Sequence, residues 1–306
     1  MEIEIEGRTL KLTNLEKVLY PDSAFTKGQV IDYYLRIAPV LLAHLRGRPL
    51  TLKRYPDGVQ GKRFYEKQTP RHRPEWVATV PIASGGRGGG ARTIDYCLCE
   101  DLPTLVWLAN LAAIELHPSL SRADRLARPT TLAFDLDPGA PADVVHCCAV
   151  ALLLHELFEE LGLRAFAKTS GSKGLQVYVP LNETEVTYAH TKPFAHAVAT
   201  LMESRRPELV ISRMTRTGRR GRVLIDWSQN DEHKTTVAVY SLRAREAPTV
   251  STPISWAEVR ACADSGDPAQ LRFTAPEVLA RVAERGDLFA GVLSLRQRLP
   301  ELSIRS

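Results

Sequence analysis

Thr131-Leu-Ala-Phe-Asp-Leu-Asp-Pro-Gly139 is the stretch from which the fold can be argued. Its apolar residues alternate with Asp135 and Asp137, which is the period-two pattern of a half-buried β-strand. The alternation places both carboxylates on one face, about 7 Å apart along the strand. Pro138 and Gly139 end the strand, so the carboxylates lie at its carboxyl end. Like charges held there repel each other, and Mg²⁺ or Mn²⁺ would relieve the repulsion because hard cations prefer oxygen ligands. The alternative is a solvated strand end with two ordinary surface aspartates.

The composition is that of a globular protein with a mild basic excess. The chain has 306 residues, of which 44% are hydrophobic and 25% charged, and its formal net charge is +5. It is long enough for one large or two small domains, and its charge favours a phosphate-bearing partner. The amino terminus lacks the pattern of a signal peptide, and the longest apolar stretch is too short to span a bilayer. Five cysteines without a C-x-x-C pair predict reduced, packed thiols. We therefore expect a soluble cytoplasmic protein with no membrane partner.

Two lysines lie where capping boxes predict helix amino termini. Thr13-Asn-Leu-Glu16 predicts a short helix, and Thr26-Lys-Gly-Gln29 predicts a helix over about 30–45. Lys17 and Lys27 fall in or just after these first turns, where carboxylates would favour helix stability. Basic side chains beside exposed backbone N–H groups make a candidate phosphate pocket. Two solvated lysines are an equally good interpretation of this pattern alone.

Positive charge and aromatic rings alternate in the next segments. A strand over 48–54 is predicted to carry Lys53 near its end, and Arg63-Phe-Tyr-Glu-Lys67 places two aromatic rings among cations. Such a stretch can stack a nucleobase while holding its phosphate. In a strand, Phe64 and Tyr65 point to opposite faces, so we expect one in the core and one exposed. The glycine-rich residues 84–90 lack a phosphate-binding motif and are interpreted as a connection.

Residues 101–115 are predicted to form an apolar helix that His117 follows directly. A single histidine after a helix is more often a capping or core residue than a catalytic one.

A strand–helix–strand–turn–strand succession around the aspartate strand indicates a sheet covered by helices. The helix is predicted over 141–162, and strands over 164–168 and 175–180 flank the turn Ser170-Gly-Ser-Lys-Gly174. This turn supplies backbone N–H groups, two hydroxyls and Lys173, which is a plausible cradle for a triphosphate. A plain hairpin turn is the alternative, since glycine and serine are expected there anyway.

A cationic segment precedes a third carboxylate. Residues 213–222, which include Arg220, form a basic, glycine-punctuated loop, and the strand predicted over 222–227 presents Asp226 at its end. A further strand is predicted over 235–242, closed by Arg243. The rest of the chain is mainly helical, with capping boxes at 255–258 and 274–277.

Together these motifs resemble the polymerase domain of bacterial ATP-dependent DNA ligase D, within the archaeo-eukaryotic primase superfamily. The motifs that carry the resemblance are Phe134-Asp-Leu-Asp-Pro-Gly139, Thr169-Ser-Gly-Ser-Lys-Gly-Leu175, Ile225-Asp-Trp-Ser-Gln-Asn230 and Tyr240-Ser-Leu-Arg243. The resemblance implies a mixed α/β (α+β) primase-polymerase fold, in which sheets flanked by helices hold the catalytic aspartates at strand ends in a cleft. We expect one catalytic unit over 1–306, with a DNA-end-binding part (1–125), a catalytic sheet part (126–250) and a helical part (251–306).

The resemblance also implies residue roles. Catalysis and the binding of two Mn²⁺ or Mg²⁺ ions would fall to Asp135, Asp137 and Asp226. Nucleotide binding would fall to His117, Ser170, Lys173, Gln176, Gln229 and Arg243, and the charge pattern adds Lys53. Lys17 and Lys27 would bind the 5′-phosphate of the downstream strand, and Phe64 would stack beside the templating base. The pattern of charges and aromatic rings adds Tyr65 and Arg220 to the predicted DNA-binding residues.

One residue departs from the family pattern. Gln176 stands where family members usually carry histidine. Glutamine can donate a hydrogen bond to a phosphate oxygen but carries neither a proton nor a charge at neutral pH. Catalysis should then be slower or more dependent on the metal ions.

The leading hypothesis is a template-dependent nucleotidyltransferase that adds ribo- or deoxyribonucleotides to a primer 3′-hydroxyl at gaps and double-strand-break ends. The resemblance implies non-homologous end joining in the nucleoid, with Ku and an ATP-dependent DNA ligase as partners. Two alternatives stay open. A primase that starts chains without a primer would share every catalytic residue, and Gln176 motivates a catalytically weak module that binds 5′-phosphorylated ends. The sequence carries no Lys-x-Asp-Gly ligase motif, so the chain is a stand-alone polymerase or an excised domain.

Overall fold

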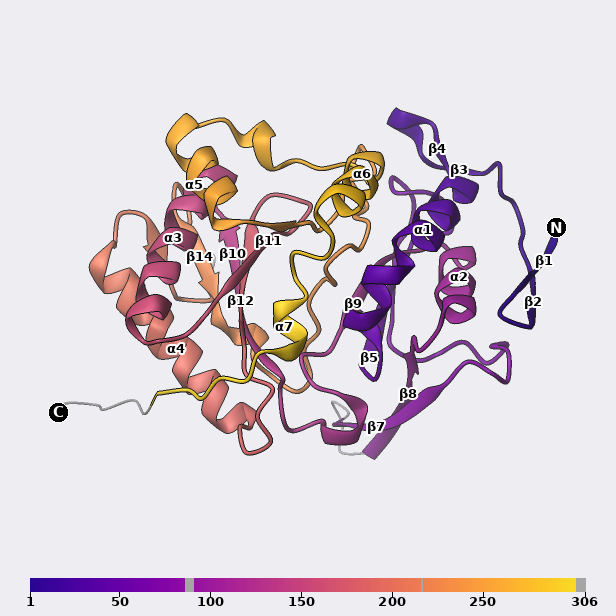
Figure 1. The fold of residues 1–306 in the computed structure, drawn as a ribbon, viewed down its shortest axis with the longest axis horizontal. Helices are drawn as coiled ribbons and strands as arrows, with labels where there is room; N and C mark the ends of the chain where they lie inside the picture. The colour runs from indigo at the N-terminus through magenta and orange to yellow at the C-terminus, as the bar shows by residue number, and fades with distance from the viewer. Residues whose placement is uncertain (86–90, 216, 301–306) are drawn as a thin grey trace. The chain divides into compact units, whose positions relative to one another are not determined.

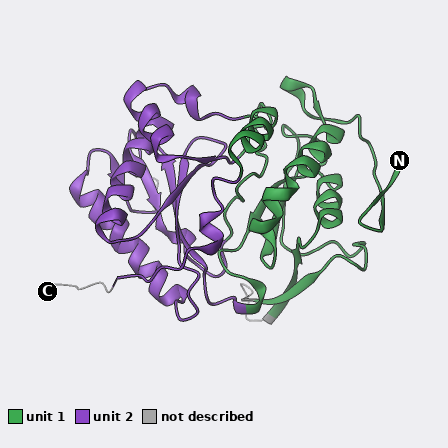
Figure 2. Ribbon diagram, in the orientation of Figure 1, with its two compact units in different colours: residues 1–124, 235–250, 274–286 green, residues 125–234, 251–273, 287–306 purple. Residues whose placement is uncertain are grey.

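The computed structural model describes residues 1–85, 91–215 and 217–300, and within them the chain forms two compact units (Figures 1 and 2). Unit 1 consists of residues 1–124, 235–250 and 274–286, and unit 2 of residues 125–234, 251–273 and the residues from 287 onward. Each unit is therefore assembled from three separated segments. The division into three consecutive parts stays a prediction. Most of the connection predicted at 84–90 lies outside the described residues.

Unit 1 combines a sheet with helices. The sheet, among the described residues, has the order β6-β5-β8-β7, with β9 also paired to β5. Its strands are β5 (Pro49–Arg54), β6 (Phe64–Glu66), β7 (Thr79–Gly85), β8 (Ala91–Leu98) and β9 (Ala113–Pro118). Smaller strands form the hairpin β1 (Glu2–Ile5) and β2 (Arg8–Lys11) and the pair β3 (Val18–Tyr20) and β4 (Phe25–Thr26). Two 3₁₀ turns are η1 (Pro21–Ser23) and η2 (Ala123–Arg125), and the last residue of η2 already belongs to unit 2. The helices are α1 (Lys27–Leu45), α2 (Leu102–Asn110) and α6 (Ala275–Arg285).

Helix α1 forms the core of unit 1 and confirms the second capping box. Thr26 Oγ1 accepts a hydrogen bond from the Gln29 backbone N–H (3.3 Å), and Gln29 Oε1 accepts one from the Thr26 N–H (2.8 Å). The helix consequently begins at Lys27, three residues before the expected start. Apolar residues at helical spacing, including Ile37 and Leu41, are fully buried, which is the pattern of an amphipathic helix.

Two predicted elements of unit 1 are wrong and a third, a helix, is shorter than predicted; a left-handed backbone lies at each failure. The short helix expected to open at Thr13–Glu16 and to end before Pro21 does not form, because Asn14 has φ +53° and a turn leads directly into β3. The helix predicted over 101–115 ends at Asn110; Ala112 has φ +55°, and β9 follows. Residues 235–242 make only isolated bridges, and Tyr240, with φ +65°, turns the chain within them. A positive φ is incompatible with a regular helix or strand.

Unit 2 is built on a six-stranded sheet in the described residues, with the order β13-β14-β10-β12-β11-β15. The strands are β10 (Thr131–Pro138), β11 (Phe166–Thr169), β12 (Leu175–Pro180), β13 (Val210–Ile211), β14 (Val223–Asp226) and β15 (Pro253–Ile254). The helical elements are α3 (Val144–Glu160), α4 (Tyr188–Arg205), η3 (Trp227–Gln229), α5 (Trp256–Ser265), η4 (Pro268–Leu271) and α7 (Gly291–Ser294). The fold class is mixed α/β, as predicted, with sheets flanked by helices (Figure 1).

The aspartate strand lies at the centre of this sheet, and its alternation is confirmed. Leu132, Phe134 and Leu136 are fully buried and belong to one core with residues of α3 and α4, which cover that face. The intervening Asp135 and Asp137 therefore lie on the opposite face. All five cysteines are free and buried, as expected for packed thiols. Among the described residues, no helix is long and apolar enough to cross a membrane.

Candidate active site

Strand pairing brings the three predicted aspartates together. Asp135 on β10 lies directly opposite Asp226 on β14, and directly opposed residues of an antiparallel pair have side chains on one face, with Cβ atoms about 5 Å apart. Asp137, two residues along β10, shares that face. Three carboxylates from two neighbouring strands are therefore concentrated at one end of the sheet.

A polar row continues from these carboxylates across the sheet. On its other side Asp135 lies opposite Gln176 on β12, and Gln176 lies opposite Lys168 on β11. Burial, together with the charges of Asp137 and Asp226, raises the pKa of Asp135 to about 7, although the Gln176 hydrogen bond and the Lys168 charge act in the other direction. Lys168 is almost completely buried, and its ammonium group donates to Ser251 Oγ (2.7 Å). The row thus balances carboxylates at one end with a buried cation at the other.

Asp226 is fixed by the residues that follow it. Its carboxylate accepts hydrogen bonds from Ser228 N (2.9 Å), Ser228 Oγ (2.5 Å) and Gln229 Nε2 (2.8 Å). Lys234 Nζ donates in turn to the Ser228 hydroxyl. The predicted Gln229 is therefore a direct neighbour of the predicted Asp226.

Asn230 fastens this turn to the aspartate strand. Its side chain is fully buried; the carbonyl oxygen accepts from Ala133 N (3.0 Å), and the amide donates to Ala133 O (2.8 Å) and Trp227 O (2.9 Å). These bonds hold the end of β14 against β10, two residues before Asp135.

The donor set suits a divalent cation. Three carboxylates supply the hard oxygen ligands that Mg²⁺ and Mn²⁺ prefer. Burial, followed by the charges of Asp137 and Asp226, raises the pKa of Asp135, and a bound cation would offset both effects. In the described residues, no three acidic, histidine or cysteine side chains already surround one point where an ion could sit. The carboxylate of Asp226 is turned toward Ser228 and Gln229. Binding would therefore require this side chain to exchange those hydrogen bonds for the ion.

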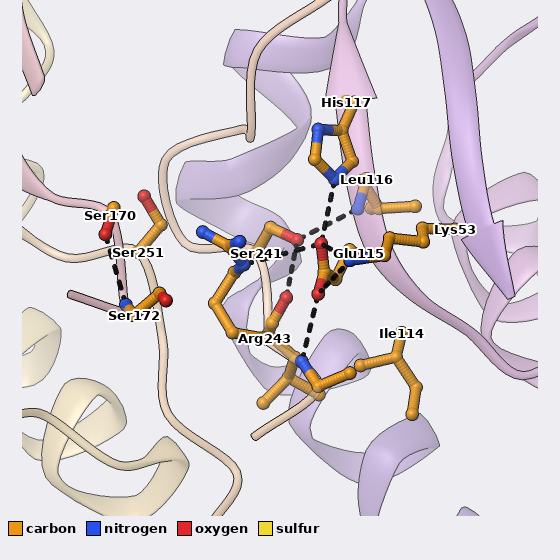
Figure 3. Close-up of polar contacts among 12 residues, drawn as sticks. Lys53, Ile114, Glu115, Leu116, His117, Ser170, Ser172, Ser241, Arg243 and Ser251 are labelled. Carbon is orange, nitrogen blue, oxygen red and sulfur yellow. Dashed lines mark hydrogen bonds and ion pairs between the residues drawn. The ribbon is translucent and has the colours of Figure 1, made fainter. Parts of the chain in front are cut away.

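The turn between β11 and β12 lies against the end of the aspartate strand. A Cβ atom on Gly174 would come within 1.9 Å of Leu136 O, so only glycine allows the turn to approach β10 this closely. Ser170 Oγ accepts from the N–H groups of Ser172 (3.2 Å) and Gly174 (3.1 Å), the first of which is drawn in Figure 3. Lys173 is exposed. The turn thus lies beside the aspartates, and its serine hydroxyl braces it. That it cradles a triphosphate stays a prediction.

The cationic loop meets the same end of β10. Gly139 N donates to Arg222 O, and Gly221 N donates to Gly139 O (both 2.8 Å). A Cβ on Gly139 would lie 1.9 Å from Arg219 O. The loop that carries the exposed Arg220 is therefore held next to the last residues of the aspartate strand.

In unit 1, three predicted nucleotide-binding residues meet at one carboxylate that the sequence analysis missed (Figure 3). Glu115 on β9 contacts Lys53 (3.2 Å), His117 (3.0 Å) and Arg243 (3.4 Å). His117 lies on a strand, not after a helix as expected. The helix predicted through residue 115 concealed the pattern, because only in a strand do residues 115 and 117 share a face.

The two predicted 5′-phosphate lysines are neighbours, but the helix N–H groups beside them are occupied. Lys27 N donates to Lys17 O and Gly28 N to Leu15 O (both 2.8 Å), and Gln29 N donates to the Thr26 side chain. The expected pocket of exposed backbone N–H groups is therefore wrong, because the capping residue and the preceding turn satisfy these donors. A phosphate would therefore have to be bound by the ammonium groups, which themselves have partners: Lys17 Nζ lies 3.2 Å from Asp57 Oδ1, and Lys27 Nζ donates to Thr13 O (2.6 Å).

Phe64 and Tyr65 are both exposed, by 43% and 65%. The expectation that one is a core residue is wrong, because β6 is a three-residue strand at the edge of its sheet. The ring of Tyr65 lies 5.5 Å from Lys53 Nζ and 6.3 Å from the His117 ring, whereas Lys62 lies over the Phe64 ring at 5.4 Å. Tyr65 thus joins the basic cluster around Glu115, and Phe64 faces away from it.

Comparison with known proteins identifies relatives over almost the whole chain. A family model described as "LigD, primase-polymerase domain" matches residues 26–289. The multifunctional non-homologous end joining DNA repair protein LigD of Mycobacterium tuberculosis is 41% identical over an alignment of 287 residues, which covers 90% of this chain and 36% of that protein. The bifunctional non-homologous end joining protein LigD of Bacillus subtilis is 31% identical over 90% of this chain and 43% of its own length. This chain thus spans less than half of these relatives.

A solved structure shares the fold. The polymerase domain of Mycobacterium tuberculosis ligase D, in complex with DNA, superimposes with a TM-score of 0.84 at 38% sequence identity. The match covers 93% of this chain and 98% of that domain.

Proposed function

The chain belongs to the LigD primase-polymerase family, and from this membership and its carboxylates we propose that it is a nucleotidyltransferase extending a primer 3′-hydroxyl at DNA gaps and broken ends. The observation that carries the proposal is the register that places Asp135 opposite Asp226, with Asp137 on the same face. The DNA in the related mycobacterial domain structure, and the end-joining names of the relatives, support DNA ends as the substrate. The proposal of 5′-phosphorylated gaps and ends rests on Lys17 and Lys27. Nucleoside triphosphates, Ku and an ATP-dependent ligase are the proposed partners.

The mechanism divides among the chain's own residues. Asp135, Asp137 and Asp226 would hold two Mn²⁺ or Mg²⁺ ions, which when bound stabilise charge that develops at the reacting oxygens. The turn that contains Ser170 and Lys173 lies against the same strand end and would receive the triphosphate. Gln176 would donate a hydrogen bond to a phosphate oxygen, and Arg220 and its loop would add positive charge. Because phosphoryl transfer depends mainly on positioning and electrostatics, no side-chain nucleophile is needed.

The basic cluster of unit 1 would bind the nucleotide through Lys53, His117 and Arg243, and Lys17 and Lys27 would bind the downstream 5′-phosphate. Phe64 and Tyr65 are exposed aromatic rings, each with a lysine nearby, a combination suited to stacking against bases.

Primer extension on a gapped duplex tests the proposal. The assay compares 5′-phosphate with 5′-hydroxyl on the downstream strand, and ribonucleotides with deoxyribonucleotides, in Mn²⁺. We expect extension that is lost in Asp135→Asn and reduced without the 5′-phosphate. Asp231→Asn serves as the matched control, because Asp231 pairs with Lys192 in the same unit, outside the proposed site.

Two other outcomes would redirect the proposal. Extension without any primer would favour a primase, which shares the same carboxylates. Gln176, the departure from the family pattern, favours a weak end-binding module; tight binding of 5′-phosphorylated ends without extension, with synthesis restored in Gln176→His, would support that alternative.

A further inference from the structure

Glu115 is the most enclosed carboxylate among the basic residues of unit 1. Its side chain is 2% exposed and lies opposite Lys53 across the β5–β9 pair. One oxygen, Oε1, lies 3.2 Å from Lys53 Nζ and accepts from Ala244 N at 3.1 Å. The other, Oε2, lies 3.0 Å from His117 Nε2 and 3.4 Å from Arg243 Nε. A single carboxylate therefore joins two strands and the segment that carries Arg243 (Figure 3).

Three basic side chains and one backbone N–H surround the two oxygens of Glu115. Together they satisfy the roughly four acceptor positions that a carboxylate offers, which is the condition for keeping it charged when it is buried. Burial alone would raise its pKa, but the hydrogen bond from His117 and the charges of Arg243 and Lys53 hold the pKa well below its usual range. Burial and the charge of Arg243 lower the pKa of Lys53, whereas Glu115 acts in the opposite direction. The carboxylate thus favours the charged form of Lys53 and offsets its repulsion from Arg243.

The contact with Glu115 also determines which ring nitrogen of His117 carries hydrogen. An ionised carboxylate can only accept hydrogen bonds, so His117 Nε2 must be the donor. Burial and the neighbouring Arg243 and Lys53 lower the pKa of His117, although Glu115 acts in the opposite direction. A neutral ring protonated on Nε2 has its lone pair on Nδ1, which then presents a hydrogen-bond acceptor away from Glu115.

Other contacts hold the backbone near Arg243 independently of Glu115. The buried hydroxyl of Tyr20 donates to Arg243 O (3.0 Å), and that of Tyr33 donates to Tyr240 O (2.8 Å). Ser241 Oγ accepts from Leu116 N (2.9 Å). Loss of the carboxylate should therefore leave this segment in place.

We propose that Glu115 is a positioning residue for the nucleotide: it holds Lys53 and Arg243 at fixed places and keeps His117 in the Nε2–H form. The proposal rests on the proposed polymerase function, in which these three side chains meet a nucleoside triphosphate. The phosphate oxygens would meet two preset cations, and a sugar hydroxyl of the nucleotide could donate to Nδ1 of His117, so less ordering would be needed on binding. Glu115 itself would not contact the nucleotide.

The test compares Glu115→Gln with the matched variant Glu66→Gln, which alters the Arg54–Glu66 pair on the same sheet (2.8 Å). Long-range nitrogen NMR of the nucleotide-free protein reports the His117 tautomer, and calorimetry with Mg²⁺-ATP reports binding. Gap-filling kinetics separate KM from kcat. We expect the Nε2–H form in the wild type and its loss in Glu115→Gln. We also expect KM to rise about tenfold or more, because charge-assisted contacts to phosphate are strong ones, with a much smaller change in kcat. Glu66→Gln should change neither the tautomer nor KM.

Each contrary outcome has a defined meaning. A wild-type His117 protonated on Nδ1 would overturn the inference without any variant, so a failure of Glu115→Gln to fold leaves it testable. The inference would also be overturned if Glu115→Gln showed the same His117 tautomer and the same KM as Glu66→Gln. Wild-type protein that binds no ATP would refute the proposed function, while the tautomer would still decide whether Glu115 positions His117.

Discussion

Raising the pH from 7 to 9 should weaken the binding of a 5′-phosphorylated duplex end about tenfold, through loss of a proton from Lys27. This lysine is almost completely buried, and its ammonium group donates to Thr13 O (2.6 Å) and Thr13 Oγ1 (3.2 Å). Burial and the neighbouring Lys17 lower its pKa to about 8. The protonated fraction is then about 0.9 at pH 7 and about 0.1 at pH 9, from the displacement of pH from pKa. If the phosphate contact requires the charge, affinity falls by the same factor.

The direction in which affinity changes with pH follows from proton linkage. A bound phosphate favours the charged lysine, so binding takes up a proton when the pH is above 8 and affinity decreases as pH rises. The phosphate cannot cause this change, because its second pKa is about 6 and it stays dianionic across the range.

Fluorescence anisotropy with matched 5′-phosphate and 5′-hydroxyl duplexes at constant ionic strength provides the assay, since salt alone changes such affinities. The preference for the 5′-phosphate should decline with a midpoint near pH 8. Lys17→Gln should move that midpoint upward, because a charge that lowers the pKa of Lys27 is removed. A preference that is constant from pH 7 to 9.5, or the same pH dependence in Lys27→Met, would refute the reasoning.

Three further predictions concern unit 2. Mn²⁺ should raise the Tm of the wild type but not that of Asp135→Asn. At a Mn²⁺ concentration of a hundred times Kd, the free energy of unfolding should increase by about 2.7 kcal/mol. Equal shifts in thermal scans of both proteins would contradict the metal assignment. Gln176→Leu should destabilise the metal-free protein by roughly 1–3 kcal/mol, because Asp135 loses a buried donor, and an unchanged urea midpoint in EDTA would count against this. Asn230→Ala should cost roughly 2–4 kcal/mol, since three buried hydrogen bonds are lost, and should also slow extension by loosening Asp226. An Asn230→Ala protein with the urea midpoint of the wild type would show that these hydrogen bonds do not stabilise the fold.

The sequence predicts local, periodic features of this protein well. The strand ending in Asp135 and Asp137 follows from alternation, and the helix starting at Lys27 follows from its capping box. Both signals lie within a few residues of the feature that they predict. Asp226 lies at a strand end, as predicted. Its position opposite Asp135 depends on the order of the strands in the sheet, which the local sequence does not determine.

The missed residues share that dependence on long-range contacts. Glu115 acquires significance only because β9 pairs with β5 and because a segment more than a hundred residues away brings Arg243. Asn230 resembles any turn asparagine until the structure shows its bonds to Ala133. The helix expected after the capping box at 13–16 and the last turn of the helix predicted over 101–115 both fail at a left-handed residue. Asparagine, as at Asn14, is enriched at positive φ, whereas alanine, as at Ala112, gives no such signal.

The most direct test of the carboxylate assignment is anomalous scattering from crystals soaked with Mn²⁺ and a non-hydrolysable nucleoside triphosphate. We predict anomalous peaks bonded to oxygens of Asp135, Asp137 and Asp226, with the side chain of Asp226 rotated away from Ser228. The triphosphate should lie beside the turn that contains Ser170 and Lys173. Peaks at other residues, with these three carboxylates left unligated while the same protein extends a primer, would contradict the assignment.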